Sequence, residues 1–281
     1  MKEIVVAIDF SKGSIHALEY AINIAKKINA NISMVWVNNF ITPETVFLPA
    51  LIRTQNRIEV KKHFENLLKK YKKKLVPGKL KYKLRKGKVY NEIANQVKQD
   101  NAYLIIAGTH GVSGFEKYWI GSNAYRIVTY SPCPVITLRN EFKFHNSIKK
   151  ILFPIDNTLE SKQKFHFTAD LASYFNAEIH VLLLYSTSLK SVQRKIDSSA
   201  IQAIKHFEGK KLNYVLERKK TDNITKTALD YAEKQNIDLI AIMTEQESTV
   251  ANIFLGPLAE KMVSHSHIPI LSIRAQKIIN N

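Results

Sequence analysis

The sequence predicts an α/β protein made of two similar domains, each an open, doubly wound sheet of five parallel strands. Three observations lead to this fold class. Short β-rich runs alternate with segments whose apolar residues recur at helical spacing, as in βαβ units. The order of these runs in residues 1–140 starts again in residues 148–276. Right-handed crossovers between parallel strands then place helices on both faces of each sheet.

The first elements follow from β-branched runs and helical spacing. A strand is expected over residues 3–9 (EIVVAID), and Ser11 is placed to cap the helix that follows it. That helix is predicted over residues 14–28, because apolar side chains recur there every three or four positions. A second strand is expected over residues 31–37 (NISMVWV), and two prolines indicate a longer connection over residues 38–49.

The rest of the first domain continues the alternation. Pro77-Gly78 marks a turn, and Gly87 ends the strand that comes after it. Apolar stripes predict the helices, whereas alternating or continuous apolar runs predict the strands. The expected order is a helix over 58–74, a strand over 80–85, a helix over 91–99, a strand over 103–107, a helix over 122–130 and a strand over 134–138.

The second domain repeats this pattern. Residues 150–156 (KILFPID) correspond to residues 3–9 at an offset of 147, and residues 239–243 correspond to the fourth strand at an offset of 135. The second copy is therefore about twelve residues shorter, most simply within the connection over 38–57. The other repeated elements are the helix over 161–175 and the strands over 177–185 and 268–273.

Composition argues against a membrane-spanning or secreted protein. No run of 18 uncharged apolar residues occurs, so we expect no membrane partner, and the N-terminus lacks the features of a signal peptide. A cytoplasmic location is therefore expected. The single cysteine, Cys133, lies just before an apolar strand and is expected to pack there. Trp36 and Trp119 are assigned to the core or to an interface because their surroundings are apolar.

The formal net charge is +18, and residues 57–88 hold 14 Lys and Arg with only two acids. Such a segment either binds nucleic acid or forms a solvated lysine-rich helix and strand. The second interpretation is favoured, because Lys outnumbers Arg and few aromatic residues lie between the charges.

A glycine-rich segment over residues 104–122 is the strongest candidate for a ligand site. An apolar strand ends at Gly108, and glycines recur with the spacing G-x2-G-x9-G before Ser122 and a helix. Glycine lets main-chain N–H groups approach an anion, and a helix N-terminus attracts phosphate. Ser122 is expected to cap that helix. The alternative is a tight turn and a capped helix with no ligand.

These residues resemble the universal stress protein family in its tandem, two-domain form. The resemblance rests on VVAIDFS near the N-terminus, on LIIAGTHGVSGFEKYWIGSNAYRIV and on SPCPVITL. It implies two sheets of the adenine nucleotide alpha hydrolase-like fold, packed as a pseudo-dimer within one chain. It also implies that a member with an intact G-x2-G-x9-G-[ST] motif binds ATP or a related adenine nucleotide.

Carried onto this sequence, the resemblance places adenine near Ala7, Asp9 and the main chain of Val37, with Asp9 on the ribose or base side. The same resemblance implies a ring of residues around the phosphates: Gly108, His110, Gly111, Gly121, Ser122 and Asn123. A magnesium ion is a candidate companion of the nucleotide. No catalytic residue and no metal ligand is assigned.

The second domain departs from this motif. Met243 stands in place of Gly108, Gln246 in place of Gly111 and Pro257 in place of Ser122. Glu245 and Glu247 add negative charge where phosphates would bind. We therefore expect one nucleotide site per chain, in the first domain.

The functional expectation is a stress-response protein that binds ATP, ADP or AMP and acts as a sensor or regulator, not an enzyme. Two alternatives stay open. One is a slow ATP hydrolase on the same site, and the other is a regulatory scaffold that binds a protein or a nucleic acid. A homodimer of tandem chains is also implied by the resemblance.

Overall fold

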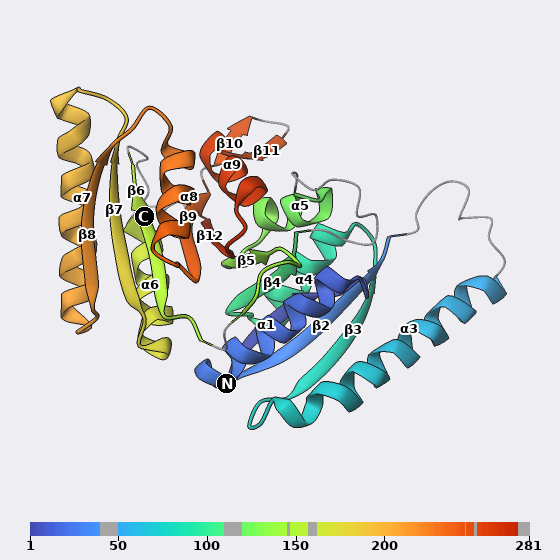
Figure 1. Cartoon of the computed structure of the whole chain (residues 1–281). Coiled ribbons are helices and arrows are strands. Elements are labelled where there is room, and N and C mark those ends of the chain that lie inside the picture. The colour runs from blue at the N-terminus through green and yellow to red at the C-terminus, as the bar shows by residue number, and fades with distance from the viewer. Residues whose placement is uncertain are drawn as a thin grey trace, which may run out of the picture.

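The structure is a computed structural model of the chain, and it describes residues 1–39, 50–109, 120–144, 147–156, 162–244, 246–249 and 252–274. Strands and helices alternate along both halves (Figure 1).

The first half has the predicted elements in the predicted order. Helix α1 begins after Ser11, whose hydroxyl accepts a hydrogen bond from the N–H of Ser14, so the predicted cap is confirmed. It ends at Asn29, which has a φ of 52° in the left-handed region. The strands are β1 (Lys2–Ala7), β2 (Ala30–Asn38), β3 (Leu80–Lys86), β4 (Leu104–Gly108) and β5 (Val135–Leu138). The helices are α1 (Lys12–Ile28), α3 (Ala50–Tyr71), the 3-10 helix η1 (Lys72–Lys74), α4 (Val89–Asp100) and α5 (Ser122–Tyr130).

The second half repeats these elements, and a hairpin precedes its last helix. Its main strands are β6 (Lys150–Ile155), β7 (Glu178–Tyr185), β8 (Tyr214–Lys220), β9 (Leu239–Thr244) and β12 (Ile270–Arg274). Its helices are α6 (Lys162–Phe175), α7 (Lys190–Gly209), α8 (Ile224–Lys234) and α9 (Pro257–His265). The hairpin pairs β10 (Gln246–Thr249) with β11 (Asn252–Leu255).

The second half is shorter than the first in the connection between its second and third strands, as the sequence offsets predicted. From the end of β2 at Asn38 to the start of β3 at Leu80 is 42 residues, whereas from Tyr185 to Tyr214, between β7 and β8, is 29. The difference of 13 residues falls between the second and third strands of each half. The sequence assigned no element to α7 and β8, and the structure places both in this shorter span.

Ten strands form one sheet in the order β3-β2-β1-β4-β5-β12-β9-β6-β7-β8. Neighbouring strands within each half are parallel. The halves meet where β5 and β12 pair in antiparallel fashion, with Ile136 opposite Leu271. The predicted fold class, two doubly wound five-stranded sheets packed as a pseudo-dimer, is therefore confirmed.

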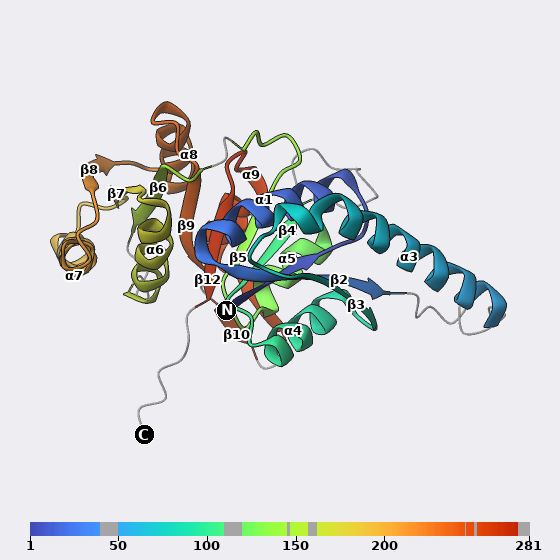
Figure 2. The same ribbon diagram turned by 90° about the horizontal axis from the view of Figure 1, so that it is seen from below.

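Helices cover both faces of this sheet. Apolar side chains of α1, α3, α6 and α7 belong to one core cluster, and those of α4, α5, α8 and α9 belong to the other. Figures 1 and 2 show α3 beside β3 at one end of the sheet and α7 beside β8 at the other end.

Side chains add further contacts between the halves. The ammonium of Lys2 lies 3.8 Å from the ring centroid of Tyr103 and 4.3 Å from that of Tyr174, and it donates a 2.7 Å hydrogen bond to the Tyr174 hydroxyl. The ring of Tyr103 stacks on Phe167 with 4.7 Å between centroids. On the other face, the guanidinium of Arg139 donates to the carbonyl of Ser264. The junction is therefore packed on both faces of the sheet.

The continuous sheet predicts that both halves unfold together. Leu271 is fully buried in the second half, and Leu271→Ala should cost about 2–5 kcal/mol because it leaves a cavity at the junction. The two tryptophans both belong to the first half, so their fluorescence reports on that half alone. We expect urea transitions followed by fluorescence and by circular dichroism to coincide and to shift together in this variant. An unchanged fluorescence transition would show that the halves unfold independently.

Candidate functional site

A cavity of about 390 Å³ opens at the carboxyl ends of β1, β2 and β4. The chain fills the sheet on one side of β1 and then crosses to β4 on its other side, so this is the topological switch point where open α/β sheets bind ligands. The lining residues come from these strand ends and from the starts of α1, α4 and α5: Ala7, Ile8, Asp9, Ser14, Val35, Trp36, Val37, Val89, Ile93, Ala107, Gly108, Thr109, Gly121, Ser122, Asn123, Ala124 and Ile127.

The structure brings together most of the residues that the sequence assigned to a site. Seven of them line this cavity: Ala7, Asp9, Val37, Gly108, Gly121, Ser122 and Asn123. The other two, His110 and Gly111, lie outside the described residues. Segments distant in sequence thus meet at one place, as expected for parallel strands.

Gly108 brings the end of β4 against the first turn of α1. A Cβ atom at Gly108 would lie 2.9 Å from the carbonyl carbon and from the oxygen of Gly13. Gly121 is also close to the main chain, because its N–H donates a 2.8 Å hydrogen bond to the carbonyl of Thr109. A Cβ at Gly121 would lie 3.0 Å from that oxygen. Both glycines therefore have a packing role that shapes the cavity wall, beside the anion contact expected from the sequence.

The start of α5 differs from the prediction. Gly121, with φ −58° and ψ 143°, holds the N-cap position, and no side chain caps the helix. Ser122 is the first helical residue, so the expected capping by its hydroxyl was wrong. The first N–H groups of an α-helix have no partner within the helix, and the helix dipole is positive at this end. The cavity wall at Ser122 and Asn123 is therefore suited to an anion.

Asp9 lies just beyond the carboxyl end of β1 and is exposed. Its Oδ1 accepts hydrogen bonds from the N–H of Ser11 at 3.0 Å and from the Ser11 hydroxyl at 2.6 Å. Its own N–H donates to the hydroxyl of Ser14 at 3.3 Å. These bonds hold the carboxylate in place beside the first turn of α1. Both bonds to the carboxylate use Oδ1, so the acceptor capacity of Oδ2 is available to a ligand with hydroxyl groups.

Sequence reasoning missed the apolar wall of the cavity. Trp36, assigned to the core or to an interface, is half-buried and lines the cavity beside Val37. Val89 and Ile93 at the start of α4 and Ile127 on α5 complete the wall. The position of Trp36 next to the predicted residue Val37, at a strand carboxyl end, is a signal that could have identified it.

The second half has a cavity at the corresponding place, but it is nearly closed. Its volume is about 30 Å³, which is the share of a single water molecule in the liquid. Nine of its lining residues occupy positions equivalent to lining residues of the first cavity. Pro154, Asp156, Ile224, Ile242, Met243, Gly256, Leu258, Ala259 and Met262 stand where the first half has Ala7, Asp9, Val89, Ala107, Gly108, Gly121, Asn123, Ala124 and Ile127.

Lys164 occupies part of the second cavity. It stands at the position of Ala17 on α1, and only 4% of it is exposed. Its ammonium donates to the carbonyl of Pro154 and lies 4.5 Å from the ring centroid of Phe153. Burial lowers the pKa of Lys164 to about 8, although the charge of Asp156 opposes this shift. A long side chain from α6 thus lines the second cavity, whereas the equivalent position of the first half holds a buried alanine.

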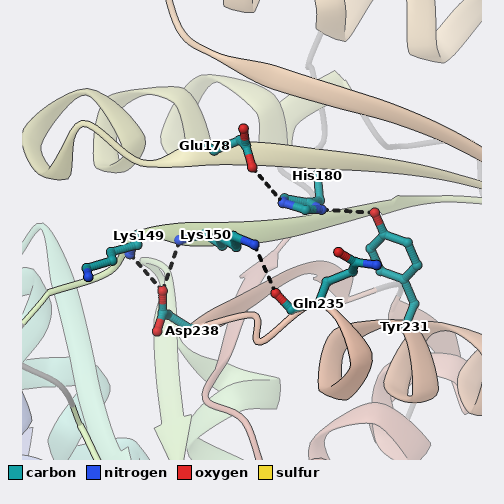
Figure 3. Close-up of polar contacts among 7 residues, drawn as sticks. All are labelled: Lys149, Lys150, Glu178, His180, Tyr231, Gln235 and Asp238. Atoms are coloured by element: carbon teal, nitrogen blue, oxygen red, sulfur yellow. Dashed lines mark hydrogen bonds and ion pairs between the residues drawn. The ribbon is translucent and has the colours of Figure 1, made fainter.

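A second polar cluster lies at the other end of the strands (Figure 3). Asp238 Oδ2 accepts hydrogen bonds from the main-chain N–H groups of Lys149 at 2.7 Å and Lys150 at 2.9 Å. His180 is buried between Glu178 and the hydroxyl of Tyr231, each 2.9 Å away. Burial lowers the pKa of His180, against the opposing hydrogen bond from Glu178. These groups satisfy one another and fix the starts of β6 and β9, so the cluster has a structural role.

Other candidate sites have little support. Within the described residues, no group of three or more His, Cys, Asp or Glu side chains is arranged to hold a metal ion. Burial raises the pKa of the Cys133 thiol to about 12, which fits the packing role expected for it. In the described part of the chain, none of the helices has the length and apolar character needed to cross a bilayer.

The basic segment over residues 57–88 lies on α3, η1 and β3. Lysines of α3 and η1 from Lys61 to Lys74 are exposed, and the apolar side chains of Phe64 and Tyr71 are buried beneath them. On β3, Lys81 forms ion pairs with Glu3 at 3.0 Å and Asp100 at 3.8 Å. Exposed lysines of this kind are expected both of a solvated helix face and of a nucleic-acid surface, so the two interpretations stay open.

Comparisons with known proteins identify relatives of both halves. The family model described as "Universal stress protein family" matches residues 1–139 and 147–274. The universal stress protein YxiE of Bacillus subtilis is 31% identical over 147 residues, which cover 49% of this chain and 98% of that protein. A universal stress protein of Methanocaldococcus jannaschii is 33% identical over 145 residues, 50% of this chain and 84% of that protein.

A solved structure shares the whole architecture. The crystal structure of a universal stress protein from Archaeoglobus fulgidus superposes with a TM-score of 0.75 and 17% sequence identity, and the match covers 98% of each chain. At this identity the likeness concerns the fold of the two halves and their arrangement.

The close approach at Gly108 predicts that Gly108→Ala destabilises the protein. The new Cβ would overlap the main chain of Gly13, and overpacking of this kind costs about 1–3 kcal/mol. Gly209→Ala at the end of α7 is the control, because a Cβ there meets nothing within 4 Å. We expect urea unfolding to show a loss of stability only for Gly108→Ala. Equal stability of the two variants would contradict the assigned packing role.

The buried ammonium of Lys164 predicts a pH-dependent stability. Its folded pKa of about 8 lies below the ordinary lysine pKa of 10.5, so the unfolded chain binds more protons between these two pH values. Stability from this group therefore rises with pH across that window. Lys164→Met should raise the free energy of unfolding at pH 7 by on the order of 3 kcal/mol. The loss of the hydrogen bond to Pro154 reduces this stabilisation. The stabilisation should fade by pH 10.5, as the amine becomes neutral in both states.

The measurement is urea unfolding at several pH values from 7 to 10.5, with Lys195→Met on the exposed face of α7 as the control. The control should follow the parent protein throughout. A stability difference for Lys164→Met that does not change with pH would contradict the burial of a charged amine.

Proposed function

The chain belongs to the universal stress protein family of stress-response proteins, and we propose that its first half binds one adenine nucleotide as a regulatory signal. The observation that carries this proposal is the cavity of about 390 Å³ at the switch point of the first half. Its volume lies within the range of about 300–1,000 Å³ that is common for small-molecule sites. Apolar walls and a few convergent polar groups line it, as in such sites.

The phosphate end of the proposed site is the start of α5. Ser122 and Asn123 line the cavity in the first turn of that helix, where N–H groups and the positive end of the dipole favour an anion. Hydrogen bonds from N–H groups to phosphate oxygens are charge-assisted and stronger than neutral ones. The net charge of +18 also draws anionic ligands toward the protein.

The nucleoside end is the space between Asp9 and Trp36. Oδ2 of Asp9 can accept hydrogen bonds from ribose hydroxyls, while Oδ1 stays bonded to Ser11. Val37 and Ala7, whose side chains pack on the same face of the sheet, provide apolar surface beside which a planar base would lie. Support for adenine in particular comes from the family resemblance, whereas the cavity supports the nucleotide class.

The proposal assigns one nucleotide to each chain. The equivalent place in the second half offers about 30 Å³, and Lys164 and Met243 line what remains. Pro257 at the start of α9 also lacks the N–H that Ser122 has at the start of α5. The second half would then act as a structural partner of the first.

The role that we infer is sensing or storage of nucleotide state in the cytoplasm, where such a sensor meets the nucleotide pool. It requires no catalytic residue. A magnesium ion would enter with the phosphates, since Mg²⁺ commonly binds through substrate phosphates. A slow hydrolase on the same site and a homodimer of tandem chains remain predictions, as does nucleic-acid binding by residues 57–88.

A pair of exchange variants tests the one-site proposal. Ser122→Pro/Asn123→Leu copies the second half into the first, and Pro257→Ser/Leu258→Asn makes the reverse change. We expect the protein to bind one ATP per chain in calorimetry. The first variant should weaken binding at least tenfold, because it removes an N–H donor and fills the cavity. The reverse variant should bind as the parent does, because Lys164 still fills the second cavity.

Phosphate release measured in the same samples separates binding from turnover. No binding of ATP, ADP or AMP by the parent would overturn the proposal. Two nucleotides per chain would overturn the assignment of a single site.

A further inference from the structure

A groove of about 510 Å³ runs between α7 and β8 at the outer end of the second half. Its floor is apolar, formed by Ala200, Ile204 and Leu216. Ile201 also lines it and is 67% exposed. The groove is independent of the nucleotide cavity, because it belongs to another half and another edge of the sheet.

The first half shows how such a groove can be filled. There, Phe64 of α3 stacks on Tyr82 of β3, with 4.6 Å between ring centroids and nearly parallel planes. In the second half, the smaller side chains of Ala200 and Leu216 lie between α7 and β8. Two aromatic rings therefore pack between helix and outer strand at β3, whereas smaller side chains leave a groove between helix and outer strand at β8.

The main chain of β8 offers hydrogen bonds along this groove. Among the described residues, β8 pairs only with β7 and forms the end of the sheet. The N–H of Ile179 donates to Asn213 at 2.9 Å, and that of Thr221 donates to Tyr185 at 3.0 Å. In a parallel ladder, alternate residues face the neighbouring strand, so odd-numbered residues of β8 face β7. The N–H and C=O groups of Leu216, Arg218 and Lys220 then point outward, and these residues also line the groove.

The charge of the groove selects its partner. Arg218 and Lys220 form a basic rim. The acid in the groove, Asp197, already accepts a 2.5 Å hydrogen bond from the Tyr185 hydroxyl. A second copy of the chain would bring another net charge of +18 to this edge, which opposes self-association. Lysines at a sheet edge discourage aggregation in general, but that purpose does not require an open apolar groove beside them.

We propose that this groove binds an extended, acidic segment of a partner protein by strand addition to β8. The segment's main chain pairs with the outward groups of Leu216, Arg218 and Lys220. Alternate apolar side chains of the segment enter the groove over Ile201 and Ile204, and acidic residues meet the basic rim. The nucleotide half and the partner-binding half would then be joined by one continuous sheet.

The probe for the test is a fluorescein-labelled peptide, Asp-Val-Glu-Ile-Asp-Val-Glu-Ile, titrated against the full chain and followed by anisotropy. We expect saturable binding that weakens at least tenfold in Ile201→Lys and in Arg218→Glu/Lys220→Glu. The matched control is Lys83→Glu/Lys86→Glu, which makes the same charge change on the outer strand β3. This control should lower the affinity less than threefold. Circular dichroism confirms that each variant is folded.

Three results would overturn the proposal. Equal losses in the two double variants would mean that net charge alone attracts the peptide. Equal binding of the lysine counterpart, Lys-Val-Lys-Ile-Lys-Val-Lys-Ile, would remove the charge selection. A concentration-dependent dimer in light scattering that Ile201→Lys abolishes would assign the groove to a second copy of the chain.

Discussion

The antiparallel pairing of β5 with β12 is the contact on which the rest of the arrangement depends. All residues of β5 and the first four of β12 are buried, so neither half could expose its last strand to water without a large loss of apolar burial. Pairing them removes one edge from each half, and among the described residues β3 and β8 form the two ends of the ten-stranded sheet. It also brings the second half close to the helix that lines the first cavity, because the N–H of Leu255 donates a 3.3 Å hydrogen bond to the hydroxyl of Tyr125 on α5.

The two halves show how one backbone can support either packing or binding. Equivalent positions surround both cavities, and the side chains decide the outcome. Side chains that fill a cavity gain dispersion contacts and bury apolar surface, whereas an open cavity gives up those contacts. Lys164 and Met243 line the nearly closed second cavity, and Gly108 stands in the first cavity at the position of Met243. The closed half is thus suited to support the sheet and the open half to hold a ligand.

The sequence was sufficient for most of the fold and for the location of the site. Periodicity and duplication determined the elements, and the rule for parallel strands brought Asp9, Val37 and Gly108 to one crevice. The prediction that Ser122 caps α5 was wrong by one position, because the backbone dihedral angles of Gly121 decide where the helix begins and apolar periodicity does not reveal them. Lys164 could not be found, because a lysine on an amphipathic helix is normally exposed. The strand β8 was missed because an edge strand is half polar, whereas the buried residues of α7 recur at helical spacing and could have identified that helix.

The excess of positive charge extends to the two outer strands of the sheet. Both outer strands carry several basic residues, and like charges oppose the edge-to-edge pairing of two chains. This repulsion favours surfaces other than these edges for any association of two chains. The same charge favours anionic partners at every exposed site, so it does not by itself distinguish the sites. The features beside the charge distinguish the two proposed sites: the start of α5 at the first cavity, and the apolar floor around Ile204 at the groove. The two proposed ligands differ for that reason, although the same positive charge would attract both.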